Sequence, residues 1–224
     1  MYWIIFGALT LISMLVSKNV ERNFKKYAKI PMNYGMTGRE VAEKMLRDND
    51  IHDVTVGQVD GTLSDHYNPA TKTLNLSHDV YYGTSVAAAA VAAHECGHAV
   101  QHATAYTWLS MRSAMVPAVN ICSRWMSWIL LAGILFINIF PNLLLVGIIL
   151  FAVTTLFSII TLPVEVNASK RALVWLNNHN VTSPETHPYA EKALQSAAYT
   201  YFMAALTSLA TLGYYLMIYL GRRD

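Results

Sequence analysis

Residues 143–162 read LLLVGIILFAVTTLFSIITL, a run of twenty residues with no charged side chain. A helix needs about 20 apolar residues to cross roughly 30 Å of hydrocarbon, so this run predicts a transmembrane helix. Apolar stretches at 116–140 and 197–221 predict two more transmembrane helices. The first of these stretches contains Asn120 and Arg124, which we expect near its entry into the bilayer.

A shorter apolar stretch at 1–17 predicts a fourth span, with aromatic residues at its outer end as interfacial anchors have. A secretory signal peptide is the alternative for this stretch. However, no basic segment precedes its apolar part, positive charges follow it, and no clear small-residue cleavage site is present. We therefore expect an uncleaved membrane anchor and four transmembrane helices in total.

The composition supports a membrane protein. The chain is 54% hydrophobic and only 13% charged, whereas soluble proteins average about 25% charged residues. The net charge of +2 gives no electrostatic support for a nucleic-acid partner. Two cysteines, Cys96 and Cys122, are too few for a disulfide framework and fit a reducing compartment or thiols buried in protein or lipid.

The distribution of basic residues predicts the orientation in the membrane. Four spans place segments 18–115 and 163–196 on the same side, and the first of these segments carries ten lysines and arginines. Loops rich in Lys and Arg stay in the cytoplasm, so we expect both segments there and both termini outside. Arg222 and Arg223 argue weakly for the reverse, but the basic cluster at 18–29 directly follows the first span.

The two polar segments contain signals for helices and strands. Thr37 followed by Glu40 matches a capping box, which predicts a helix that runs to about Asn49. An alanine-rich run at 84–104 predicts a second helix, and a third is expected to begin near Pro163. Alternating patterns predict a small antiparallel sheet of two or three strands, at 54–59, 63–67 and 73–77.

The alanine-rich helix carries the motif His94-Glu95-Cys96-Gly97-His98. Two histidines four residues apart lie on one helical face, so both imidazoles can reach a single ion. Imidazole nitrogen is a preferred zinc ligand, and the intervening glutamate can act as general base on a zinc-activated water. We therefore predict a zinc site with His94 and His98 as ligands and Glu95 as the base.

The alternative is a helix that happens to carry these three side chains on its surface. Three features argue against it. Charged residues are costly in an apolar helix unless they are paired or bind a metal. Glu95 is the only acid between Asp79 and Glu165. The strand at 73–77 is a candidate edge strand, of the kind that zinc peptidases use to align an extended peptide.

Catalytic zinc needs a third protein ligand and one open position. Glu165 is the best candidate, because it follows the span at 143–162 and lies on the predicted side of the motif. An acid that merely favours the start of a helix is the alternative for Glu165. His102 is the rival ligand, but it lies eight residues from His94 and would need a bend in the helix to reach the same ion.

Three segments carry a resemblance to a known family. LSDHYNP at 63–69, LNLSHDVYYGTSVAAAAVAAHECGHAVQ at 74–101 and LPVEVNASKRAL at 162–173 resemble the YugP-type neutral zinc metallopeptidases of bacterial membranes. The likeness extends over nearly the whole chain. It implies four membrane spans, a gluzincin-like zinc site and peptidase activity.

A more distant resemblance is to HtpX-type and CAAX-prenyl-type membrane proteases, whose third ligand is the Glu of an E-x-x-A-D motif. Here the motif begins at Glu165 and keeps the alanine, but Ser169 stands in place of the aspartate. That aspartate orients a histidine ligand. Ser169 could do so more weakly, or Asn167 could help.

Candidate donors for the substrate's carbonyl oxygen are His66, His187 and Tyr201. A hairpin hydrogen bond is the alternative role for His66, and interfacial anchoring is the alternative for Tyr201. His187-Pro188 resembles a Thr-His-Pro segment of the HtpX-type enzymes, although a surface histidine at the start of a helix is the simpler explanation.

The sequence therefore predicts a mainly α integral membrane protein with four transmembrane helices and a cytoplasmic gluzincin-like zinc peptidase core. Its expected function is a zinc metalloendopeptidase that cleaves membrane or membrane-proximal proteins at the cytoplasmic surface. The expected partners are a protein or peptide substrate and the lipid bilayer, with no nucleic acid; an oligomer or partner membrane proteins stay open. The alternatives are a non-catalytic metal-binding scaffold or adaptor and, with less support, a transporter.

Overall fold

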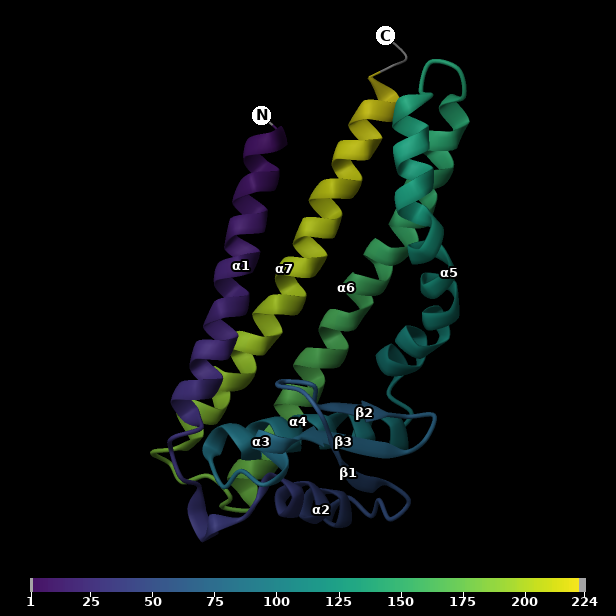
Figure 1. The fold of residues 1–224 in the computed structure, drawn as a ribbon. Coiled ribbons are helices and arrows are strands. Elements are labelled where there is room, and N and C mark those ends of the chain that lie inside the picture. The colour runs from purple at the N-terminus through teal and green to yellow at the C-terminus, as the bar shows by residue number, and fades with distance from the viewer. Residues whose placement is uncertain (1, 222–224) are drawn as a thin grey trace.

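The computed structural model describes residues 2–221, apart from the side chains of residues 2–5 and 33. The basic tail at Arg222 and Arg223 lies outside the described residues. Long helices rise side by side from a layer of shorter elements (Figure 1). The long helices are α1 (Tyr2–Tyr27), α5 (Thr107–Leu135), α6 (Pro141–Asn178) and α7 (His187–Leu220).

Within the described residues, three helices are long and apolar enough to cross a membrane, namely α5, α6 and α7. The fourth predicted span lies in α1, whose first side chains are outside the described part, and it stays a prediction. In the bundle, α6 packs against both α5 and α7, and α1 packs against α7. The helices α5 and α6 approach each other closely, since a β-carbon built at Gly133 would lie 2.6 Å from the Leu144 Cα atom.

The prediction of a separate soluble helix from Pro163 is wrong, because α6 runs without interruption from Pro141 to Asn178. A proline inside a helix removes one backbone hydrogen bond, but the contacts of α6 with α4 and α7 outweigh that loss. At 1.5 Å per residue a helix of this length extends about 57 Å, well beyond a bilayer core of about 30 Å. One rigid element therefore joins the apolar run at 143–162 to Glu165.

The predicted starts at 116 and 197 also fall inside helices, because α5 begins at Thr107 and α7 at His187.

The layer below the bundle is built around α4 (Val86–Ala103), which is buried on nearly all sides. Ser85 caps its start by accepting a hydrogen bond from the Ala88 N–H at 3.2 Å. The alanines that precede the motif have no exposed surface and let neighbouring elements approach closely: Ala87, Ala88, Ala89, Ala90, Ala92 and Ala93. The predicted helix at 84–104 is thus confirmed within two residues at its start and one at its end.

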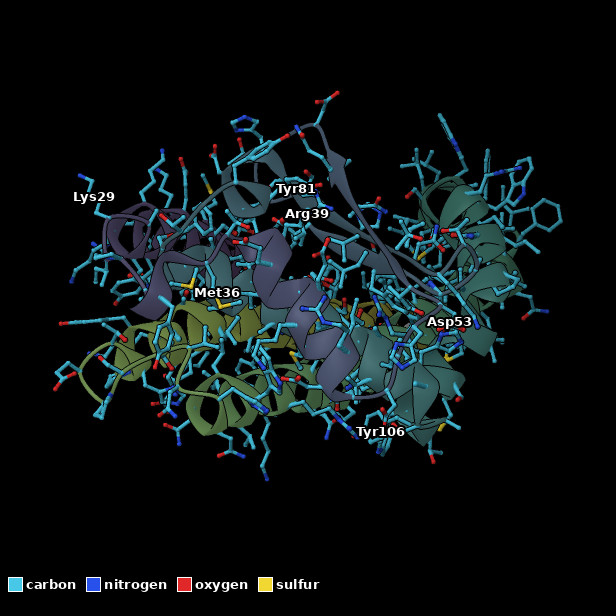
Figure 2. The ribbon with its side chains drawn as sticks, turned by 90° about the horizontal axis from the view of Figure 1, so that it is seen from below. Lys29, Met36, Arg39, Asp53, Tyr81 and Tyr106 are labelled. Atoms are coloured by element: carbon cyan, nitrogen blue, oxygen red, sulfur yellow. The ribbon has the colours of Figure 1, made fainter. Side chains whose placement is uncertain are left out.

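Two shorter helices complete this layer, α2 (Gly38–Asp48) and α3 (His78–Tyr81). The predicted capping box is confirmed, because Glu40 accepts a hydrogen bond from the Thr37 N–H at 2.7 Å and donates its own N–H to the Thr37 hydroxyl. Seen from below, Arg39 of α2 lies beside Tyr81 of α3 (Figure 2), with its guanidinium 5.6 Å from the ring centre. This contact joins α2 to α3.

The sheet contains β1 (Thr55–Val59), β2 (His66–Asn68) and β3 (Thr73–Ser77) in the order β1-β3-β2. The tight turn after Asn68 makes β2 and β3 antiparallel, as predicted. In contrast, β1 pairs in parallel with β3, so the expectation of an antiparallel sheet is wrong and the sheet is mixed. The reason is that the loop between β1 and β2 takes the chain past the position of β3 to its far side. The hairpin of β2 and β3 then brings β3 back between β1 and β2.

The same strand order overturns the expectation that the strand at 73–77 is an edge strand. It is the central strand, with partners on both sides, so its backbone cannot pair with a further peptide. The edges of the sheet are β1 and β2, and β2 is the edge strand that packs against α4.

A close contact between α4 and α6 sets the position of the motif. A β-carbon built at Gly97 would lie 2.6 Å from the Ala168 carbonyl oxygen and 3.0 Å from its Cα atom. The obstructing atoms are backbone, so they cannot move aside without shifting α6. Glycine at this position therefore allows the two helices to approach as closely as they do.

We expect Gly97→Ala to destabilise the protein by about 1–3 kcal/mol, the usual range for overpacking a well-packed interior. Gly213→Ala is the matched control, because no atom lies within 4 Å of a β-carbon built there. Thermal unfolding in detergent, followed by circular dichroism, compares the two. Equal melting temperatures for both variants would contradict the assignment of Gly97 as the contact that limits helix approach.

Candidate metal centre

Two imidazoles and one carboxylate converge where α4 meets α6. The Nε2 atoms of His94 and His98 lie 3.3 Å and 3.6 Å from Glu165 Oε2. One ligand atom from each residue lies within 4.8 Å of the other two. The histidines meet because they are one helical turn apart, and Glu165 reaches them because Gly97 lets α6 approach.

Hydrogen bonds fix the orientation of the His98 ring. The Gln101 amide donates to the Val164 carbonyl oxygen at 2.8 Å and to Asn167 Oδ1 at 3.0 Å. This orients the Gln101 oxygen toward His98 Nδ1, at 3.1 Å. Since an amide oxygen only accepts, Nδ1 of His98 must donate, and the neutral ring has an unprotonated Nε2 that faces Glu165.

His94 is held in a similar way by Ser169, whose hydroxyl lies 3.1 Å from His94 Nδ1. The sequence suggested this role for Ser169 in place of an aspartate. Asn167 acts one step further away, as a partner of Gln101 rather than of a histidine. Both rings therefore have their Nδ1 atoms occupied and their Nε2 atoms directed at Glu165, the orientation that metal-binding histidines adopt.

The site is suited to a divalent cation. Glu165 Oε2 is buried without a hydrogen-bond partner, and the Nε2 atoms of both imidazoles face it. Burial lowers the pKa of His98, but the nearby carboxylates of Glu165 and Glu95 outweigh this effect and raise its pKa overall. These carboxylates thus favour positive charge between the rings. Two imidazoles and a carboxylate form a ligand set typical of catalytic zinc.

Glu95 lies in the same cavity but belongs to no ligand cluster among the described residues. Its side chain is buried, and its Oε2 atom accepts a hydrogen bond from the Tyr67 N–H at 3.1 Å. Tyr67 is the middle residue of β2, so the outward-facing backbone of the edge strand holds the carboxylate. The cavity measures about 280 Å³ and is lined by Glu95, His98 and Glu165, together with residues of β2, α5 and α7.

Comparisons with known proteins agree with this geometry. Residues 2–220 match the model of a family described as "Putative neutral zinc metallopeptidase". The chain belongs to this family. It is also 41% identical over 213 residues to the "Putative membrane protease YugP" of Bacillus subtilis (strain 168), a match that covers 95% of this chain and 94% of that protein. No solved structure matches the chain.

The structure of this metallopeptidase-family chain separates the three predicted oxyanion donors. Tyr201 of α7 lines the cavity, and the charges of Glu165 and Arg112 act on its hydroxyl group. His66 also lines it, but its Nδ1 lies 2.8 Å from the Ser64 carbonyl oxygen and its Nε2 lies 3.2 Å from the Asn75 amide. A neutral His66 therefore has no free donor.

The structure does not bring His187 to the cavity. It lies at the start of α7, where its Nδ1 contacts the Thr182 hydroxyl at 2.9 Å. Since α7 is one continuous helix, His187 lies about 21 Å along the axis from Tyr201. The rival ligand His102 is also outside the ligand cluster, because its Nδ1 contacts the Tyr67 hydroxyl at 2.9 Å.

Two residues at the site did not emerge from the sequence. Gln101 could have been found from its spacing, because it lies three residues after His98 and is the next polar side chain on that face of an alanine-rich helix. Local sequence patterns show Arg112 only as one of the ten basic residues of segment 18–115. Its place in the cavity depends on how α5 lies against α6, which no local pattern reveals.

We expect Ser169→Ala to weaken zinc binding about 10- to 100-fold, the usual effect of removing a residue that orients a ligand. Ser169→Asp should keep or strengthen binding, because a carboxylate is the better acceptor for His94 Nδ1–H. Competition with a chelator on the purified protein measures both. Ser158→Ala, on the same helix but bonded only to the Thr154 carbonyl, is the control. Unchanged affinity in Ser169→Ala would show that the hydroxyl does not orient His94.

Proposed function

We propose that the chain is a zinc metalloendopeptidase that hydrolyses peptide bonds of membrane or membrane-proximal proteins at the cytoplasmic surface. His94, His98 and Glu165 hold the zinc, and Glu95 is the general base. The observation that carries this proposal is the convergence of three ligand atoms from α4 and α6 beside a further buried carboxylate. Membership of the metallopeptidase family supports it.

A bound zinc ion supplies a Lewis acid that lowers the pKa of water and polarises a carbonyl group. Glu95 takes a proton from the attacking water and passes it to the leaving amine. The Tyr67 N–H holds one oxygen of the Glu95 carboxylate, so the other oxygen is left to carry the proton. Burial of Glu95 keeps bulk water from competing for it.

The substrate backbone aligns along β2, which replaces the strand at 73–77 in this role. β2 is an edge strand, and its middle residue contacts the general base directly. An extended peptide that lies along an edge strand gains main-chain hydrogen bonds without regard to sequence. The Tyr67 N–H is not available for such a bond, because Glu95 accepts it. A peptide beside Tyr67 would therefore lie next to Glu95 and the proposed ligands.

Substrates come from the membrane or its border. Besides polar groups, the cavity lining includes Leu109 and Val116 of α5 and Tyr201 of α7, two helices that continue into the apolar bundle. An unfolded loop or juxtamembrane tail of a membrane protein can reach such a cavity while its own helix stays in lipid. Residues deep in the bilayer cannot, because they are hydrogen-bonded within their helix.

We expect Glu95→Gln to bind zinc normally and to lose cleavage activity about 10²- to 10⁴-fold, because a general base contributes this much. Glu165→Ala should lose both zinc and activity. Metal analysis of each purified variant, together with cleavage of fluorescently labelled β-casein, gives both quantities. Glu191→Gln, an exposed change on α7, is the control. Equal cleavage by the wild type and Glu95→Gln would favour a non-catalytic metal-binding scaffold.

The cytoplasmic position of the site has its own test. Asp60 lies in the soluble layer and Asn142 at the opposite end of the bundle, and both are exposed. Both native cysteines are buried. We expect an impermeant maleimide to label Asn142→Cys in intact cells and Asp60→Cys only after permeabilisation. The reverse pattern would place the site outside.

A further inference from the structure

The cavity beside Glu95 contains one permanently positive side chain among its described lining residues, that of Arg112. It lies on the second turn of α5. The lining also holds the carboxylates of Asp65, Glu95 and Glu165. Arg112 is thus placed to offset part of this negative charge, and its one ion pair, with Glu165, is long.

The guanidinium of Arg112 is incompletely satisfied. Its Nη1 atom lies 3.9 Å from Glu165 Oε1, close enough for a weak ion pair but too long for a hydrogen bond. Its Nε atom is buried without a hydrogen-bond partner. The guanidinium carbon lies 5.9 Å from the centre of the Phe157 ring, a contact that uses none of its N–H groups as hydrogen-bond donors to oxygen.

Unsatisfied donors in a partly apolar cavity are costly unless a ligand completes them. The other candidate donors are weaker. A neutral His66 has both ring nitrogens engaged, and His187 lies far along α7. Tyr201 lines the cavity, but its hydroxyl offers one neutral donor near the Glu165 carboxylate.

We propose that Arg112 donates hydrogen bonds to the carbonyl oxygen of the peptide bond under attack and stabilises the negative charge that forms there. This inference rests on the proposed hydrolase function. As the water oxygen bonds to the carbonyl carbon, the carbonyl π electrons move to the oxygen that Arg112 contacts, and Glu95 takes the water proton. When the C–N bond breaks, those electrons reform the carbonyl and the proton passes to the amine.

An arginine suits this role because it stays charged and gives up no proton, so its contribution does not depend on proton transfer. Its planar donors can reach an oxygen that has moved out of the plane of the original peptide. An alternative role is purely positional, in which Arg112 only orients Glu165. The two roles differ in which measurement changes, because a positioning role acts through metal binding.

The test uses the full chain in detergent, with labelled β-casein as the probe. For Arg112→Gln we expect kcat to fall about 10²- to 10³-fold, as when an oxyanion donor is removed, with KM within threefold of wild type and zinc content unchanged. The kcat of Arg112→Lys should lie between those of the wild type and Arg112→Gln, since lysine keeps the charge without the planar geometry. Arg124→Gln, on the same helix and outside the cavity lining, is the matched control and should keep full activity.

Chemical rescue gives a second readout that does not depend on how well one variant folds. Added guanidinium at millimolar concentration should raise kcat of Arg112→Gly about tenfold or more and leave the wild type unchanged. A kcat for Arg112→Gln within threefold of wild type, or a loss that follows zinc loss, would overturn the inference while the hydrolase proposal stands. If the wild type shows no cleavage that depends on zinc and Glu95, the hydrolase proposal itself fails and takes the inference with it.

Discussion

The close approach of α4 and α6 at Gly97 and Ala168 is the contact on which the candidate metal centre depends. Two histidines one turn apart on α4 can bind the same ion, but they do not complete a metal site, because a third ligand must come from another element. Glu165 arrives from α6 only if the helix axes come close enough for its short side chain to reach both rings. A side chain at residue 97 would push α6 away by acting on backbone atoms.

Once the helices meet, polar groups that would be costly in an alanine-rich core satisfy one another. Gln101 has no exposed surface, yet its amide bonds to Val164 and Asn167 and its oxygen accepts from His98. Such a network is stabilising only when it is complete, since each lost partner leaves a buried group unsatisfied. The same bonds fix the tautomer of His98, so helix packing and imidazole chemistry are determined by one set of contacts.

The sequence predicted what depends on local spacing. The motif helix and the capping box at Thr37 follow from local spacing, and the apolar runs at 116–140, 143–162 and 197–221 follow from their length. The structure has a helix in each place, although α5 ends at Leu135, before the predicted end at 140. Glu165 was identified because acids are scarce in this part of the chain, and it lies beside the histidines.

Predictions of features that depend on contacts between distant segments were absent or wrong. The parallel pairing of β1 with β3 made the strand at 73–77 central, and β2 became the edge strand next to Glu95. Pro163 suggested a break, but packing on both sides of α6 keeps that helix continuous. His187 was set apart from the site because α7 is likewise unbroken.

The continuity of α6 has a consequence for the depth of the site in the membrane. Glu165 follows the apolar run at 143–162 by three residues, or about 4.5 Å of helix rise, with no flexible linker between them. If that run lies in the hydrocarbon, the proposed ligand is fixed at its border, where water is available for hydrolysis. If the ligand were on a separate soluble helix, its depth relative to the membrane would depend on the length and conformation of the linker between the two helices. Under the proposed function, α6 would therefore limit cleavage to substrate segments that have just left the lipid.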